Sequence, residues 1–140
     1  MKITVVGLGY VGMSLSVLLS QKYQVVALDI NNNTIKKINL KQSPIKDNLI
    51  SNYLLKKKLK LLATNNKSKA YKDAEYVIIS TPTDYDEKTG SFDTSTVEQT
   101  IKDAIKFNKK CNIVIKSTIP LGFTDYVSNK FKNKNIFFSP

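Results

Sequence analysis

The stretch KITVVGLGYVG, residues 2–12, decides the fold of this chain of 140 residues. A short apolar strand that runs into G-x-G-x-x-G and then into a helical pattern is typical of a dinucleotide-binding βαβ unit. Gly7 lets the chain turn sharply off the strand, Gly9 leaves room for a pyrophosphate beside the backbone, and Gly12 lets the helix pack closely. The phosphates then meet free N–H groups at the positive end of the helix dipole.

A carboxylate follows where this unit needs one. Asp29 closes a second apolar run, Val25-Val26-Ala27-Leu28. At the end of the second strand it would accept hydrogen bonds from both hydroxyls of the adenosine ribose, and its charge would repel a 2′-phosphate. We therefore expect NAD rather than NADP. Two alternatives stay open, because Asp29 could cap the next helix instead, and the nearby Lys36-Lys37 pair could tolerate a phosphate.

Composition restricts the class of protein. The length and the 41% hydrophobic content fit one globular domain, which we expect to be a dinucleotide-binding domain over residues 1–140. No apolar run approaches the ~18 residues of a membrane span, and the amino terminus does not resemble a signal peptide. A single cysteine, Cys111, fits the reducing cytoplasm. The sequence contains no histidine, which excludes Ser-His catalysis within these residues and argues against a metal site.

The net charge of +11 could indicate a nucleic-acid partner. All 22 basic residues are lysines, however, whereas proteins that read phosphates and bases favour arginine. The lysines are also scattered rather than arranged in a stripe, apart from the run at 56–58. We therefore expect no nucleic acid among the partners, and we expect the charge to attract an anionic substrate such as a nucleotide sugar.

Strand and helix patterns alternate to the end of the chain, which is typical of a parallel sheet covered on both faces. Apolar runs predict six strands, at residues 2–6, 24–29, 60–63, 76–80, 112–116 and 135–138. Helical patterns lie between them, after residue 10 and at 34–40, 48–57, 68–72, from 95 onward and at 122–132. Right-handed crossovers then give the strand order 3-2-1-4-5-6, a Rossmann-type doubly wound α/β fold.

The same patterns predict local details. The first helix should bury an apolar face made of Val11, Leu15, Leu18 and Leu19. Residues 81–93 should form a long polar loop, and the helix after it should begin with the capping box Ser95-x-x-Glu98. The last strand should leave Phe137 and Phe138 uncovered at the sheet edge, unless the helix at 122–132 folds over both rings.

Three loops should meet at the carboxyl edge of the sheet, namely residues 7–12, 81–86 and 117–120. Ligands of open α/β sheets bind there, at the point where the strand order reverses. Thr81, Pro82 and Thr83 would lie beside the pyrophosphate and the nicotinamide ribose, and Ser117 and Thr118 closer to the reactive ring. Taken singly, these hydroxyl residues are also common as turn formers and helix caps.

Beyond the glycine motif, the chain resembles the amino-terminal domain of the UDP-sugar dehydrogenases. The likeness lies in residues 2–12 (KITVVGLGYVG), 25–30 (VVALDI), 77–86 (VIISTPTDYD), 115–124 (IKSTIPLGFT) and 136–140 (IFFSP). The TPTDYD segment favours the branch that acts on UDP-glucose over the branch that acts on UDP-N-acetyl-sugars. A regulatory NAD(H)-sensing Rossmann module is the alternative of another class, but such a module has no reason to carry the TPTDYD and KSTIP segments.

The resemblance implies an NAD-dependent oxidation of UDP-glucose to UDP-glucuronate with two NAD+ and a cysteine thiohemiacetal. By position it puts Tyr10 and Val11 at the pyrophosphate, Asp29 at the ribose and Thr83 near the cofactor, and it gives Thr118 a catalytic role beside C6 of the sugar. Thr34 stands where relatives often have a basic residue, which would weaken a contact to the adenosine.

The family's catalytic glutamate, lysine, asparagine and cysteine, and its UDP-binding domain, follow the part of the family that these residues resemble. Cys111 precedes the fifth predicted strand, away from the carboxyl edge, so it does not replace the nucleophile. We therefore expect a cloned domain or a truncated gene product that binds NAD but turns over no substrate alone. UDP-glucose binding and a homodimer are expected only of the full-length enzyme.

Overall fold

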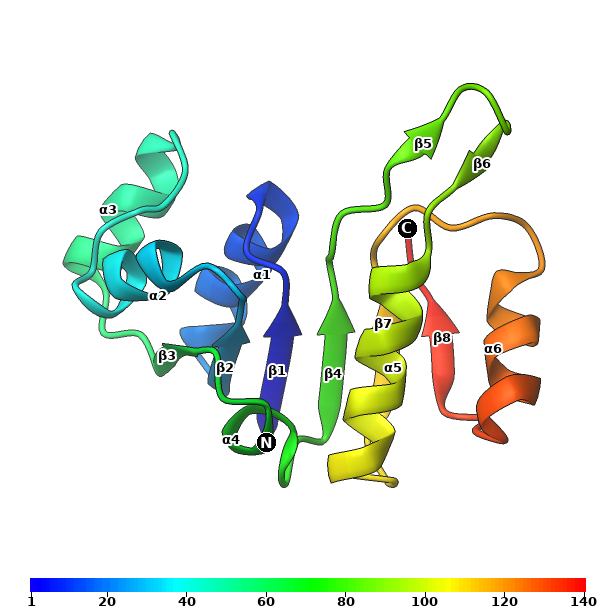
Figure 1. Cartoon of the computed structure of the whole chain (residues 1–140). Helices are drawn as coiled ribbons and strands as arrows, with labels where there is room; N and C mark the ends of the chain where they lie inside the picture. Colours follow the sequence, from blue (N-terminus) through cyan, green and yellow to red (C-terminus); the bar gives the residue numbers. More distant parts are fainter.

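The alternation of strands and helices is confirmed by a computed structural model, which describes residues 1–140 (Figure 1). The strands are β1 (Lys2–Val6), β2 (Gln24–Leu28), β3 (Leu61–Thr64), β4 (Tyr76–Ile79), β5 (Tyr85–Asp86), β6 (Ser91–Phe92), β7 (Asn112–Ile115) and β8 (Ile136–Phe138). The helices are α1 (Tyr10–Ser20), α2 (Asn32–Asn39), α3 (Asn48–Lys56), α4 (Lys67–Tyr71), α5 (Ser95–Phe107) and α6 (Phe123–Phe131).

Six strands form one parallel sheet in the order β3-β2-β1-β4-β7-β8. This is the predicted order 3-2-1-4-5-6, and the predicted Rossmann-type fold is confirmed. The order reverses between β1 and β4, because the chain crosses from the β3 edge back to the centre of the sheet. The carboxyl ends of β1 and β4 therefore diverge into loops on opposite sides of one crevice.

The apolar core has two parts, one on each face of the sheet. Alternate strand residues point to opposite faces, so Val5 belongs to the cluster that includes residues of α1, α2 and α3, whereas Val6 belongs to the cluster that includes residues of α4, α5 and α6. Helices cover both faces of the sheet, and α5 crosses in front of it in Figure 1. Burial on both faces explains why the central strands have nearly continuous apolar sequences.

The predicted buried face of α1 was wrong for Val11 and Leu18, whereas Leu19 packs partly buried against the core. Val11 and Leu18 are 51% and 63% exposed, whereas the buried residues of the helix are Gly12, Met13, Ser16, Val17 and Ser20. A Cβ atom on Gly12 would lie 1.8 Å from the carbonyl oxygen of Gly7, so the helix is held very close to the glycine loop. Small residues at one-turn spacing permit this approach, and they rather than the leucines define the face that packs on the sheet.

Two details around α5 also differ from the sequence predictions. The polar loop at 81–93 contains an antiparallel hairpin of β5 and β6, in which the rings of Tyr85 and Phe92 lie 5.0 Å apart. This hairpin projects beyond the carboxyl ends of the parallel strands (Figure 1).

The predicted capping box at the start of α5 is absent, because Thr94 is the N-cap of this helix and its side chain makes no capping hydrogen bond. Glu98 instead pairs with Lys130 of α6, and Asp93 accepts from the Ser95 N–H.

The strand β8 is the outer strand of the sheet, with β7 as its only neighbour. Ile136 is buried, but Phe137 and Phe138 remain 49% and 44% exposed. The helix α6 packs on this strand without covering either ring. The predicted uncovered edge is therefore present in these residues.

Candidate functional site

A cavity of about 920 Å³ opens at the carboxyl edge of the sheet, where the strand order reverses. Its walls come from the glycine loop after β1, the end of β2, the end of β4 and one side of α5. Seven of the residues singled out from the sequence line it, namely Gly7, Gly9, Tyr10, Val11, Asp29, Thr81 and Pro82. The topology thus brings the first two predicted loops together.

The three glycines of the motif meet different requirements. Gly7 has a φ of +85°, in the left-handed region, and a Cβ there would lie 2.7 Å from the carbonyl oxygen of Ser80. Gly12 does not line the cavity, and its role is the close contact between helix and loop described above. A Cβ on Gly9 would meet no atom within 4 Å, so only open space of the cavity lies beside it.

The amino end of α1 presents free hydrogen-bond donors to the cavity. The first helical bond runs from the Met13 N–H to the Gly9 carbonyl, and the N–H groups of Tyr10, Val11 and Gly12 have no acceptor in the structure. Gly9 offers no side-chain cap, and the first turn contains no acidic residue. Uncapped donors together with the helix dipole form an electrostatic site for an anion.

Asp29 is held at the rim by two backbone donors. Its Oδ2 accepts from the Leu8 N–H at 2.9 Å, and its Oδ1 accepts from the Asn31 N–H at 2.9 Å. The carboxylate therefore joins the glycine loop to the chain after β2. It is not the cap of α2, because Asn31 fills that position with its own side chain. Each carboxylate oxygen retains a further lone pair, so the group can still accept from a ligand.

The segment after β4 is fixed by contacts with α5. The Thr96 hydroxyl donates to the Pro82 carbonyl at 2.9 Å and lies 3.2 Å from the Thr81 hydroxyl. Ser80, which also lines the cavity, has a buried hydroxyl with no partner. An unpaired buried hydroxyl is costly, so this orphan group beside the glycine loop suits a site that receives a polar ligand.

The remaining predicted residues lie outside the cavity wall. Thr83 is half-buried in the chain that leads to β5, and Thr118 is exposed in the loop after β7. The Ser117 hydroxyl is buried and donates to the Thr81 carbonyl at 2.7 Å, so it ties the loops after β4 and β7 together. The third predicted loop thus lies against the second, behind the wall of the cavity.

One part of the cavity has no counterpart in the sequence predictions. Lys67 and Tyr71 of α4, with Gln99 and Asp103 of α5, form its far end, and the fully exposed Ile30 flanks it from the β2 side. Burial raises the pKa of Tyr71, and the nearby carboxylate of Asp103 raises it further. No local motif marks these residues, because α4 and α5 follow strands that β2 and β1 separate in the sheet.

Cys111 lies at the opposite end of the sheet, immediately before β7. Its side chain is buried, its Sγ approaches the Asn108 carbonyl at 3.2 Å, and burial raises the pKa of its thiol. A protonated, buried thiol is a poor nucleophile.

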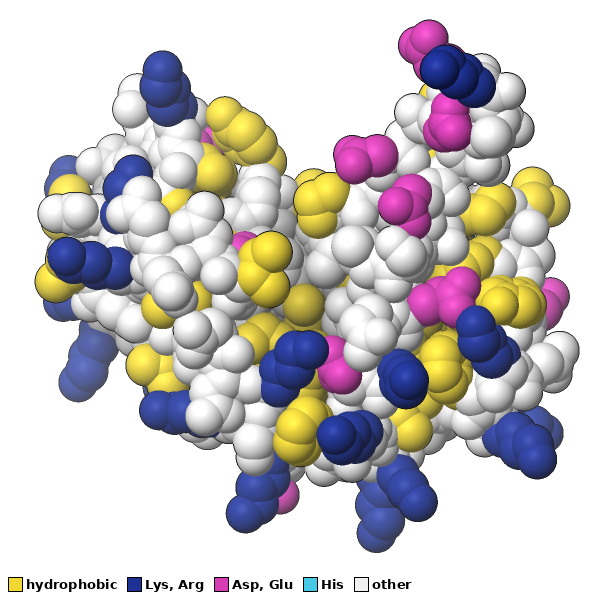
Figure 2. Space-filling model, viewed as in Figure 1, with side chains coloured by type: hydrophobic (Ala, Val, Ile, Leu, Met, Phe, Trp, Pro, Cys, Tyr) yellow, Lys and Arg dark blue, Asp and Glu magenta, His cyan; other side chains and the backbone are white.

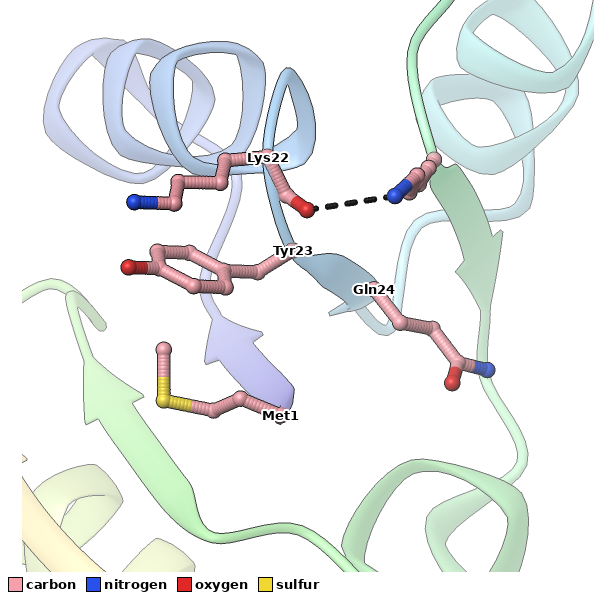
Figure 3. A pocket seen from close by; sticks show the side chains of 5 residues that line it. Met1, Lys22, Tyr23 and Gln24 are labelled. Carbon is pink, nitrogen blue, oxygen red and sulfur yellow. Dashed lines mark hydrogen bonds between the residues drawn. The ribbon is translucent and has the colours of Figure 1, made fainter.

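A second, smaller cavity of about 470 Å³ lies at the amino ends of the strands. It is lined by Met1, Lys22, Tyr23, Gln24 and Lys60 (Figure 3). It contains none of the predicted site residues.

The described residues include no group of three or more potential metal ligands. None of the helices combines the length and the apolar composition that crossing a membrane requires.

The face shown in Figure 2 carries acidic side chains on and below the β5–β6 hairpin, and lysines around the left side and the lower edge. The hairpin and its flanks contribute Asp84, Asp86, Glu87 and Asp93.

The residues present fit a dinucleotide. Free N–H groups begin α1 where Gly9 leaves open space, the unpaired Ser80 hydroxyl is buried beside Gly7 and Gly12, and a carboxylate stands at the end of the neighbouring strand. This donor set suits a pyrophosphate, and the carboxylate suits a ribose diol. The cavity continues beyond Asp29 and has room for a base.

Comparisons with known proteins agree with this geometry. The sequence model of the UDP-glucose/GDP-mannose dehydrogenase family, NAD binding domain, matches residues 1–137. The UDP-glucose 6-dehydrogenases of Streptococcus pneumoniae and Campylobacter jejuni are 49% and 46% identical to the whole of this chain. The chain spans 36% of the length of each. A solved UDP-D-ManNAc dehydrogenase from Pyrococcus horikoshii is 27% identical, with a TM-score of 0.83 over 99% of this chain and 34% of its own.

Proposed function

From the premise that this chain belongs to the UDP-glucose/GDP-mannose dehydrogenase family, as its NAD-binding domain, we propose that it is the cofactor half of an enzyme that oxidises UDP-glucose. The observation that carries the proposal is the cavity that joins the uncapped end of α1, Asp29 and the Thr81-Pro82 segment. The sugar is proposed from the names of the two relatives that are nearly half identical over this whole chain.

NAD, when bound, accepts hydride from the alcohol carbon of the sugar. The N–H groups of Tyr10 and Val11 would donate to the pyrophosphate, and Asp29 would accept from the adenosine ribose. Thr81, Pro82 and Thr83 would border the nicotinamide half, with Ser117 holding this segment in place through the Thr81 carbonyl. Thr118 is proposed as the catalytic residue of this domain, because its exposed hydroxyl follows β7 at the carboxyl edge.

This chain by itself offers no accessible thiol for the second oxidation. Its one cysteine is buried at the far end of the sheet, and the named relatives are almost three times as long as the matched region. We therefore propose that turnover requires residues that this chain does not contain. Calorimetric titration of the purified chain should show binding of NAD and none of UDP-glucose, and a mixture of both should produce no NADH.

The full-length S. pneumoniae relative serves as the positive control for that assay. A chimera provides the second arm, in which this chain replaces the matched residues of the relative. The chimera should oxidise UDP-glucose, and Thr118→Ala should lower its kcat while the chain still binds NAD. Sustained NADH formation by the chain alone would contradict the proposal that turnover requires residues outside this chain. Absence of NAD binding would overturn the proposal that the cavity is the cofactor site.

A further inference from the structure

The far end of the cavity is built by an ordered polar network between α4 and α5. Lys67 Nζ lies 2.7 Å from Oδ2 of Asp103, and Gln99 Nε2 donates to Oδ1 of the same carboxylate at 3.0 Å. Both carboxylate oxygens are thus engaged, and the Asp103 side chain is only 14% exposed. All three residues line the same cavity as Asp29.

This network determines which way the Gln99 amide faces. An ion-paired carboxylate accepts hydrogen bonds and donates none, so the end of the Gln99 amide that faces Asp103 must be its NH₂ group. The amide oxygen, Oε1, must then point away from Asp103, and no donor of the protein reaches it. The cavity is therefore lined, at its far end, by a glutamine that offers an acceptor.

The apolar surface that a base requires is also present. Ile30 follows Asp29 directly, lines the same cavity and is 95% exposed. A large apolar side chain left fully exposed beside a polar rim is a suitable contact for the face of a purine. Since Asp29 is the group that suits a ribose, the base of the same nucleoside would extend from it toward Ile30 and Gln99.

We propose that Gln99, positioned by Asp103 and Lys67, makes the cavity specific for a purine with an amino group at position 6. This inference rests on the proposed function, because it assumes that a dinucleotide occupies the cavity. The amino group of adenine donates to Oε1, whereas hypoxanthine presents a carbonyl oxygen at the same position, and two acceptors repel each other. A site built around one hydrogen bond rejects an analogue that lacks the donor.

The test compares NAD with nicotinamide hypoxanthine dinucleotide, in which a carbonyl oxygen replaces the 6-amino group of the purine and N1 carries a hydrogen. Calorimetric titration of the 140-residue chain should give a Kd about tenfold weaker for the hypoxanthine analogue, as expected for one hydrogen bond. Gln99→Met keeps the length of the side chain and removes the acceptor, so the ratio of the two Kd values should fall to about one. Lys102→Met is the matched control, because Lys102 is an exposed residue of α5 outside the cavity, and it should retain the tenfold ratio.

Asp103→Asn separates positioning from direct contact. An asparagine can donate as well as accept, so the Gln99 amide is free to turn over, and the ratio should fall to about twofold while Gln99 itself is intact. Circular dichroism melting checks that each variant folds. If Asp103→Asn does not fold, the ratio of Kd values in Gln99→Met alone tests the proposal. Equal Kd values in the unmodified chain, or a tenfold ratio that survives Gln99→Met, would overturn the inference and leave NAD binding standing. Failure to bind either dinucleotide would instead overturn the proposed function.

Discussion

Gly9, the N-cap of α1, and Gly12, in the first turn of this helix, are required for different reasons. Gly9 faces open space, whereas Gly12 is in contact with the backbone of Gly7. Gly9→Ala should therefore cost less than about 1 kcal/mol of unfolding free energy, the scale of an N-cap change. Its methyl group should nevertheless weaken NAD binding about tenfold, because it occupies the place proposed for the pyrophosphate.

Gly12→Ala is the matched comparison and should behave in the opposite order. A Cβ only 1.8 Å from a carbonyl oxygen forces the loop or the helix to move, which should cost about 1–3 kcal/mol of unfolding free energy. Urea unfolding and NAD titration of both variants separate the two effects. A large loss of stability in Gly9→Ala, or none in Gly12→Ala, would contradict this reading of the loop.

Asp29 links the glycine loop to the chain after β2, besides its proposed contact with the ribose. Asp29→Ala should weaken NAD binding strongly, and it should narrow the preference for NAD over NADP because the repelling charge is gone. It should also cost about 1–3 kcal/mol of stability, since the N–H groups of Leu8 and Asn31 lose their acceptor.

Asp47→Ala is the control for that second effect. Asp47 caps α3 through the Ile50 N–H, away from the cavity, so its loss should lower stability without changing the ratio of NAD to NADP affinity. Calorimetry with both dinucleotides gives the ratio. Equal affinities for NAD and NADP in the unmodified chain would show that Asp29 does not govern the choice of cofactor. Lys36 and Lys37, which could tolerate a phosphate, lie outside the cavity wall.

The strand β8 presents both an unpaired backbone edge and two half-exposed aromatic rings. Such an edge favours pairing with another chain, and a charged residue on it opposes that pairing. Light scattering should detect self-association of this chain at high concentration, and Phe137→Lys should reduce it. Leu18→Lys is the control, because Leu18 is an apolar residue exposed on a helix and lacks an unpaired strand edge. A chain that stays monomeric at high concentration would show that the edge is protected.

The charge of the whole molecule is poorly compensated. The net charge is +11, and the structure contains three ion pairs, all with a partly exposed partner. Repulsion among the lysines should therefore outweigh attraction between opposite charges. At 0.1 M salt this repulsion is largely screened between charges more than about 10 Å apart. Raising sodium chloride from low concentration to roughly 0.3 M should raise the Tm by a few degrees.

The same salt should weaken NAD binding, because the pyrophosphate is anionic and its proposed site is electropositive. Measuring the Tm with and without saturating NAD at each salt concentration distinguishes the two effects, since bound NAD stabilises the chain by mass action. A Tm that falls with salt in the absence of NAD would mean that the ion pairs dominate over the repulsion.

The sequence by itself determined the order of the strands and the positions of Gly7, Gly9, Gly12 and Asp29. These features are local, because apolar runs identify strands, the glycine spacing identifies the turn, and right-handed crossovers leave one arrangement of the sheet. Element boundaries agree with the prediction to within a few residues for the same reason. The family resemblance also rested on contiguous segments, which need no tertiary information.

Only the tertiary structure decided what the elements present to one another. The buried face of α1 follows from the contact of Gly12 with Gly7, not from the spacing of its leucines. Glu98 has a capping position in the sequence but meets Lys130 on another helix. The far wall of the cavity joins Lys67 to Asp103 across 36 residues, and no local pattern connects them. Contacts of this kind depend on how two helices settle on the sheet, and a side chain's partner is fixed by that packing rather than by its neighbours in the chain.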